Sequence, residues 1–181
     1  MAVKTVQAVV NGQTYTLTLN SSTGKYEATI TAPSKSSYNL TGHYYPVTVK
    51  AEDEAGNSET VTTSDTTLGS SLQLKVKEKV APIITITSPT AGAYITSNKP
   101  VIKWKVTDED SGVNTATIGI TIDSGSKITG DSIIKTAVTG GYECAYTPGT
   151  ALSDGSHTIK IDASDNDGNA ATQKSVTFKI D

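Results

Sequence analysis

The sequence predicts an all-β protein made of two tandem domains, and three observations support this. Short segments alternate apolar and polar residues between Gly, Pro, Asn and Asp, and no helical period runs along the chain. Apolar residues are 35% of the chain, which suits thin β layers rich in Thr and Ser. One motif occurs twice, beginning at residues 45 and 157, which indicates a duplicated unit.

The second half of the chain contains the clearer pattern. Seven strands are predicted, at 83–87, 101–107, 117–123, 133–138, 142–146, 157–163 and 175–180. About 100 residues with seven short strands and regular turn signals are typical of an immunoglobulin-like sandwich. Residues 81–181 are therefore expected to form a seven-stranded immunoglobulin-like domain.

Strand alternation also predicts the core of this domain, because every second side chain points inward. The expected inward residues are Ile84 and Ile86; Ile102, Trp104 and Val106; Ile118, Ile120 and Ile122; Tyr142, Cys144 and Tyr146; Ile159, Ile161 and Ala163; and Val176, Phe178 and Ile180. The strand IIKTAV at 133–138 does not indicate which of its faces is buried.

The first half is an incomplete copy of the second. YPVTVKAEDEAGN at 45–57 aligns with HTIKIDASDNDGN at 157–169, and at the same offset VQAVVN at 6–11 aligns with IGITID. Residues 1–80 are therefore expected to form an incomplete immunoglobulin-like domain that lacks its first two strands, because nothing in it corresponds to residues 82–112. Such a domain would expose a core face and a strand edge.

Three remedies for that gap are open. An eight-residue insertion within 58–70 could fold over it, a partner chain could add a strand, or the sequence could be cut from a longer protein. Between the copies the chain runs through Pro82 without a Gly/Ser linker.

The segments VTVKAEDEAGN, IKIDASDNDGN, APIITITSPTAGAYI and WKVTDEDSGV resemble the tandem bacterial immunoglobulin-like (Big-type) repeats of phage tail and virion proteins, bacterial surface adhesins and extracellular enzymes. The resemblance covers residues 82–181 and the later strands of 1–80. It implies an immunoglobulin-like fold and a role as a spacer or a binding tip.

Net charge and hydropathy exclude several classes of binding partner. A net charge of −3, without a run of Lys or Arg, argues against nucleic acid and anionic membranes. No apolar stretch approaches the length of a membrane helix, so no membrane insertion is expected, and the N-terminus MAVKTVQAVVNG lacks the apolar region of a signal peptide. The expected location is a virion or an extracellular surface, reached without a signal peptide.

Four carboxylates raise two hypotheses. Asp108 and Asp110 lie in DEDSG, and Asp165 and Asp167 lie in DNDG. Each loop could simply close a turn, with carboxylates accepting backbone N–H groups. Alternatively, because these loops should lie at the same end of the domain as Glu78 in the linker, their oxygens could together bind Ca²⁺, the only cofactor the sequence suggests.

Catalysis is not expected. His43 and His157 both begin strands and complete no triad, and the single cysteine, Cys144, is expected to face inward. A separate cluster, Tyr38, Tyr44 and Tyr45, could stack on a surface carbohydrate or could pack a corner of the first domain.

These observations predict a non-enzymatic immunoglobulin-like structural or binding module on the exterior of a phage tail or virion. It would mediate assembly or surface attachment, with the first domain contacting other virion or surface chains. The alternatives are a fragment of a bacterial cell-surface adhesin stalk and a carbohydrate-binding accessory module.

Overall fold

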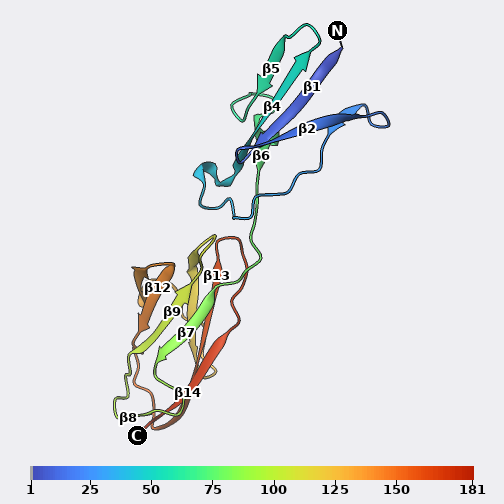
Figure 1. Cartoon of the computed structure of the whole chain (residues 1–181). Helices are drawn as coiled ribbons and strands as arrows, with labels where there is room; N and C mark the ends of the chain where they lie inside the picture. The colour runs from blue at the N-terminus through green and yellow to red at the C-terminus, as the bar shows by residue number, and fades with distance from the viewer. Residues whose placement is uncertain (1) are drawn as a thin grey trace. The chain divides into compact units, whose positions relative to one another are not determined.

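The computed structural model describes residues 2–181 and is all β (Figure 1). The chain divides into two compact units, Met1–Glu78 and Lys79–Asp181, where the sequence suggested a boundary at residue 80. Residues 2–181 form no helix long and apolar enough to cross a membrane.

The second unit contains two four-stranded sheets. Its elements are β7 (Ile83–Ser88), β8 (Tyr94–Ile95), β9 (Ile102–Thr107), β10 (Val113–Ile122), the short 3-10 helix η3 (Gly130–Ser132), β11 (Ile134–Val138), β12 (Gly141–Tyr146), β13 (Gly155–Asp165) and β14 (Lys174–Ile180). One sheet has the order β10-β13-β14-β8 and the other β11-β12-β9-β7. All seven predicted strands are present, and β8 is an additional two-residue strand.

The core of the second unit lies between these sheets. Ile102, Trp104 and Val106 of β9 and Ile118 and Ile120 of β10 are at most 1% exposed, as strand alternation predicted. The structure also resolves the ambiguous strand: Ile133 is buried in the core, whereas Ile134 is 66% exposed.

The first unit is built around one sheet. Its elements are β1 (Val3–Val10), β2 (Gln13–Asn20), β3 (Lys25–Glu27), η1 (Thr41–His43), β4 (Tyr45–Asp53), β5 (Ser58–Val61), η2 (Gly69–Leu72) and β6 (Gln73–Leu74). The strand order is β3-β2-β1-β4-β5, and β6 also pairs with β4.

A change of strand partner explains the single sheet. In the second unit β12 pairs with β9, and β11 pairs with β12. These three strands form most of the second sheet. The first unit has no counterpart of β9, so its β2–β3 hairpin hydrogen-bonds to the edge of β1 instead. Cys144 is consequently buried against β9, whereas the aligned Ala28 follows β3 and is exposed.

The insertion in the first unit extends the sheet edge. Tyr45 pairs with Leu74 just as His157 pairs with Phe178, so β6 corresponds to part of β14. β5, at residues 58–61, pairs along the same edge of β4 as β6, and the chain between β5 and β6 loops out of the sheet. The residues of β5 thus lie within the sheet and do not cover its face.

Candidate functional site

The acidic loop that ends β13 is closed by its own hydrogen bonds. Asp165 is 1% exposed, and its Oδ1 accepts the Asn169 backbone N–H at 2.7 Å while its Oδ2 accepts the Asn169 side-chain amide at 2.6 Å. Gly168 between them has φ +97°, a conformation that side chains other than glycine rarely adopt. The carboxylate therefore stabilises the turn.

The equivalent loop of the first unit repeats this geometry. Asp53 accepts the Asn57 backbone N–H and side-chain amide, each at 2.9 Å, and the Ala55 N–H at 2.8 Å. The hydrogen bond from the Asn57 side chain is the main cause that holds the pKa of Asp53 below its usual value; desolvation opposes it, and the backbone N–H donors add to the lowering. The motif Asp-x-x-Gly-Asn is thus a turn-capping unit in both copies.

In the second unit, the loop that follows β9 is hydrogen-bonded to the turn that ends β13. Asp108 accepts the N–H groups of Asp110 and Gly112 at 3.1 and 2.7 Å. The backbone N–H of Asn166 then donates to the Gly112 carbonyl at 3.0 Å. A main-chain hydrogen bond therefore links two loops that are distant in sequence, and the Asn166 side-chain amide adds bonds to the Ser111 and Gly112 carbonyls.

The structure brings two of the four predicted metal-ligating residues together. Carboxylate oxygens of Asp108 and Asp165, both in buried side chains, lie within 4.8 Å of each other. Within residues 2–181, Asp110 and Asp167 join no group of three or more converging ligand side chains. Calcium binding at this end of the domain stays a prediction.

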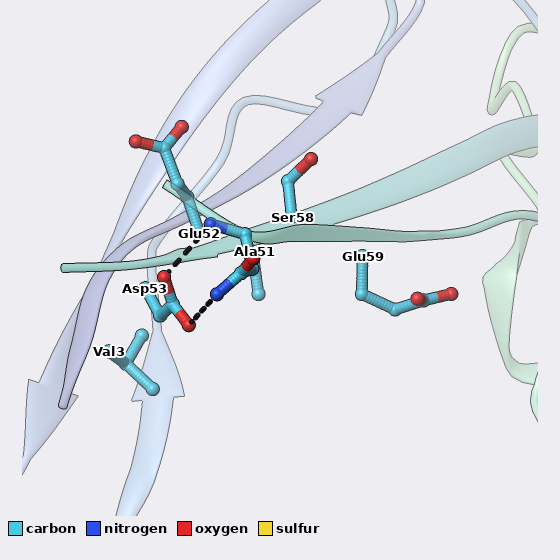
Figure 2. A pocket seen from close by; sticks show the side chains of 7 residues that line it. Val3, Ala51, Glu52, Asp53, Ser58 and Glu59 are labelled. Carbon is cyan, nitrogen blue, oxygen red and sulfur yellow. Dashed lines mark hydrogen bonds between the residues drawn. The ribbon is translucent and has the colours of Figure 1, made fainter. Parts of the chain in front are cut away.

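A hollow in the first unit was not anticipated from the sequence. It has a volume of about 300 Å³, and Figure 2 shows Val3, Ala51 and the acidic side chains of Glu52, Asp53 and Glu59 among the residues that line it. The missing counterpart of β7 and β9 predicted an exposed core face in this unit but not where it lies; the signal for its position is the alignment of Ala51 with Ala163, a core residue of the second unit.

The three predicted tyrosines differ in exposure. Tyr45 is 7% exposed and its hydroxyl donates to the Lys35 carbonyl at 3.1 Å, so it belongs to the core of the first unit. Tyr38 is half-buried and stacks on His43 with ring centroids 4.6 Å apart, and Tyr44 is half-buried. Only Tyr38 and Tyr44 keep partly exposed rings for a ligand.

Residues 82–161 match the family model of the bacterial Ig domain. The second unit is therefore similar to the bacterial Ig domain and has an immunoglobulin-like fold. Domains of this family are typically non-enzymatic modules that serve structural or binding roles, often outside the cell. No curated protein matches the chain.

Two solved structures show distant similarity. CopC from Methylosinus trichosporium OB3b has 23% identity and a TM-score of 0.40, covering 55% of this chain and 94% of CopC. The fibronectin(III)-like modules of CbhA from Clostridium thermocellum have 18% identity and a TM-score of 0.36, covering 99% of this chain and 78% of theirs.

The second unit also contains a histidine–aspartate pair, His157 and Asp123, that sequence reasoning missed. His157 is 7% exposed; its Nδ1 lies 2.7 Å from Asp123 Oδ2 and its Nε2 lies 2.8 Å from the Ser153 carbonyl. Both partners are acceptors, so both ring nitrogens must carry protons for both hydrogen bonds to form. The bond to Asp123, and next that to Ser153, raises the pKa of His157, against a smaller effect of burial.

The thiol of the same domain is unsuited to nucleophilic chemistry. Cys144 is 3% exposed, and burial raises its pKa to about 11 although Lys135 opposes the shift. A thiol at neutral pH with this pKa is almost entirely protonated.

Proposed function

We propose that this protein is a non-enzymatic binding and spacing module on the exterior of a phage tail or virion, where it mediates assembly or surface attachment. The family match of the second unit supports the general role of such a module. The particle location rests on the resemblance of its motifs to the repeats of virion proteins.

One observation carries the division of roles between the units. Both layers of the second unit close over a shared core, whereas the first unit has one sheet on which Val3 and Leu19 are 46% and 57% exposed. Exposed apolar strands favour aggregation, so a protein that served only as a spacer would be more soluble if both units had two layers around a buried core. The first unit therefore attaches to another chain, and the second holds the exposed position.

The test is immunogold electron microscopy with an antibody against residues 79–181. Gold on the exterior of purified particles, absent from a stock in which the gene is deleted, is the expected result. Label on the bacterial envelope but not on particles would contradict the virion role and support an adhesin stalk. Binding to an immobilised glycan that is lost in Tyr38→Ala would support the carbohydrate-binding alternative.

A further inference from the structure

The main sheet of the first unit has one apolar face. Ladder partners project from the same side of a sheet, and the pairs Val6–Leu17, Ala8–Val49 and Val49–Val61 therefore place their side chains together. The neighbouring positions face the other way and include the matched residues Gln7, Thr16, Lys50 and Thr60. One side of the sheet thus has the composition of a core.

This apolar face is covered incompletely. Val6, Ala8 and Val10 are 8%, 9% and 3% exposed, so other parts of the first unit already cover the middle and one end of this face. At the other end Val3 is 46% exposed, beside the hollow of Figure 2. Val49 and Ala51 of β4 are half-buried between these ends.

The second unit shows what covers the same positions when the domain is complete. Ile161 and Ala163 of β13, which align with Val49 and Ala51, are 0% and 4% exposed. They belong to a cluster that includes Ile84 of β7 and Trp104 and Val106 of β9. Those two antiparallel strands are the elements that the first unit lacks.

The uncovered part of the face is acidic as well as apolar, so a segment that covers it must supply positive charge. Asp53 and Glu59 lie at the hollow on the apolar side of the sheet, opposite Val3 and Ala51 in the ladder. Of the acidic residues lining the hollow, the salt bridges within residues 2–181 neutralise Glu52 alone, through Lys4 at 2.8 Å. In the second unit the chain that leads into β7 carries a cation, Lys79. A basic segment therefore complements this face.

We propose that the apolar face of the first unit docks two antiparallel β-strands of a partner chain, with alternating apolar side chains and lysines near the point of entry. The docked strands supply the uncovered part of the second layer, with their apolar residues on Val3, Val49 and Ala51 and a lysine beside Asp53 and Glu59. This inference rests on the proposed attachment through the first unit and specifies the chemistry of its partner.

The experiment uses the full chain and a fluorescent synthetic peptide with the sequence of residues 79–108, which contains β7 and β9 and carries four lysines and one aspartate. Saturable binding, followed by fluorescence anisotropy, is expected, and it should weaken with added salt. Glu59→Lys should weaken binding about fivefold, because it reverses a charge on the docking face. Thr60→Lys, the next residue of β5 on the opposite face, is the matched control and should bind as the unchanged protein does.

A second variant, Ala51→Arg, places a cation on the floor of the hollow and should abolish binding. Glu59→Lys, in an exposed side chain, keeps the test decisive if Ala51→Arg does not fold. Equal affinities of Glu59→Lys and Thr60→Lys, or no saturable binding at millimolar peptide, would overturn the proposal. Because the assay uses purified components, strand binding without gold on particles would refute the virion role and leave the docking surface standing.

Discussion

At the scale of single residues, the acidic loops act mainly as turn caps. Asp165 and Asp53 each accept the backbone N–H and the side-chain amide of the asparagine four residues later. Asp165 is buried, whereas Asp53 is half-exposed. In each turn, both carboxylate oxygens accept N–H groups of the same asparagine. If an amide replaced the carboxylate, its NH₂ group would face the NH₂ group of that asparagine, and one hydrogen bond would be lost.

Asp165→Asn is therefore expected to lower the free energy of unfolding of the second unit by about 1–3 kcal/mol. Thermal melting in chelator measures this loss, and Asp53→Asn, in the exposed turn, should cost less. Unchanged stability of Asp165→Asn would contradict the capping role.

The same variant tests the calcium hypothesis. Asp108 and Asp165 place carboxylate oxygens within 4.8 Å, and two like charges that close repel each other without a cation. A Ca²⁺ ion bound at about 100 times its Kd would stabilise the folded protein by roughly 2.7 kcal/mol. If the site is real, melting curves of the unchanged protein in millimolar Ca²⁺ and in chelator should differ, and those of Asp165→Asn should coincide. Coinciding curves for the unchanged protein would refute it.

His157 gives the second unit a pH-dependent stability. Its pKa in the folded state lies above the unfolded value of about 6.5, so the stabilisation is fully present below that pH and is lost as pH rises through the folded pKa. Burial alone would raise the pKa of Asp123, but the hydrogen bonds from the Thr158 N–H and the His157 ring outweigh it and keep that pKa low.

The melting temperature of residues 79–181 should accordingly fall between pH 6 and pH 9. His157→Tyr is the matched variant, because Tyr45 occupies the aligned position and donates its hydroxyl to a backbone carbonyl. It should remove most of this fall. A variant whose melting temperature follows pH as the unchanged domain does would exclude His157 as the titrating group.

At the scale of elements, β9 founds the second layer of the immunoglobulin-like domain. It pairs with both β7 and β12, and its Trp104 is 1% exposed at the centre of the core. The indole Nε1 has no hydrogen-bond partner within residues 2–181, so the ring contributes packing and apolar burial.

Trp104→Ala should lower the free energy of unfolding of the second unit by about 3–5 kcal/mol, because it leaves a large cavity. Trp104→Phe should cost less, since it keeps much of the ring and removes an N–H group that gains no hydrogen bond. Urea unfolding of residues 79–181 measures both losses. A near-zero effect of Trp104→Ala would contradict the buried register of β9.

At the scale of the whole molecule, the two units should differ in self-sufficiency. Residues 79–181 close two sheets over one core, whereas residues 1–78 leave part of an apolar face uncovered. Exposed sheet faces and edges favour self-association.

Expressed separately, residues 79–181 should be monomeric and unfold cooperatively, and residues 1–78 should oligomerise or aggregate at the same concentration. Light scattering coupled to size-exclusion chromatography distinguishes these states. A well-dispersed, monomeric NMR spectrum of residues 1–78 would show that the unit closes itself.

The sequence by itself determined the all-β class, the seven main strands of the second unit and their inward residues. It also identified the turns that Asp53 and Asp165 close. These features are local: a two-residue alternation defines a strand and its buried face, and Asp, Asn and Gly at fixed spacing define a turn. The two-residue strand β8 escaped because it is too short to show a period.

Only the tertiary structure decided which edges the strands share and which distant side chains meet. The β2–β3 hairpin joins β1 because β9 has no counterpart in the first unit, and a strand pairs with whichever edge is free. The pair His157 and Asp123, the approach of Asp108 to Asp165 and the hollow beside Ala51 likewise depend on how separate strands and loops are brought together. Local alternation records which face of a strand is apolar, but it carries no information about what covers that face.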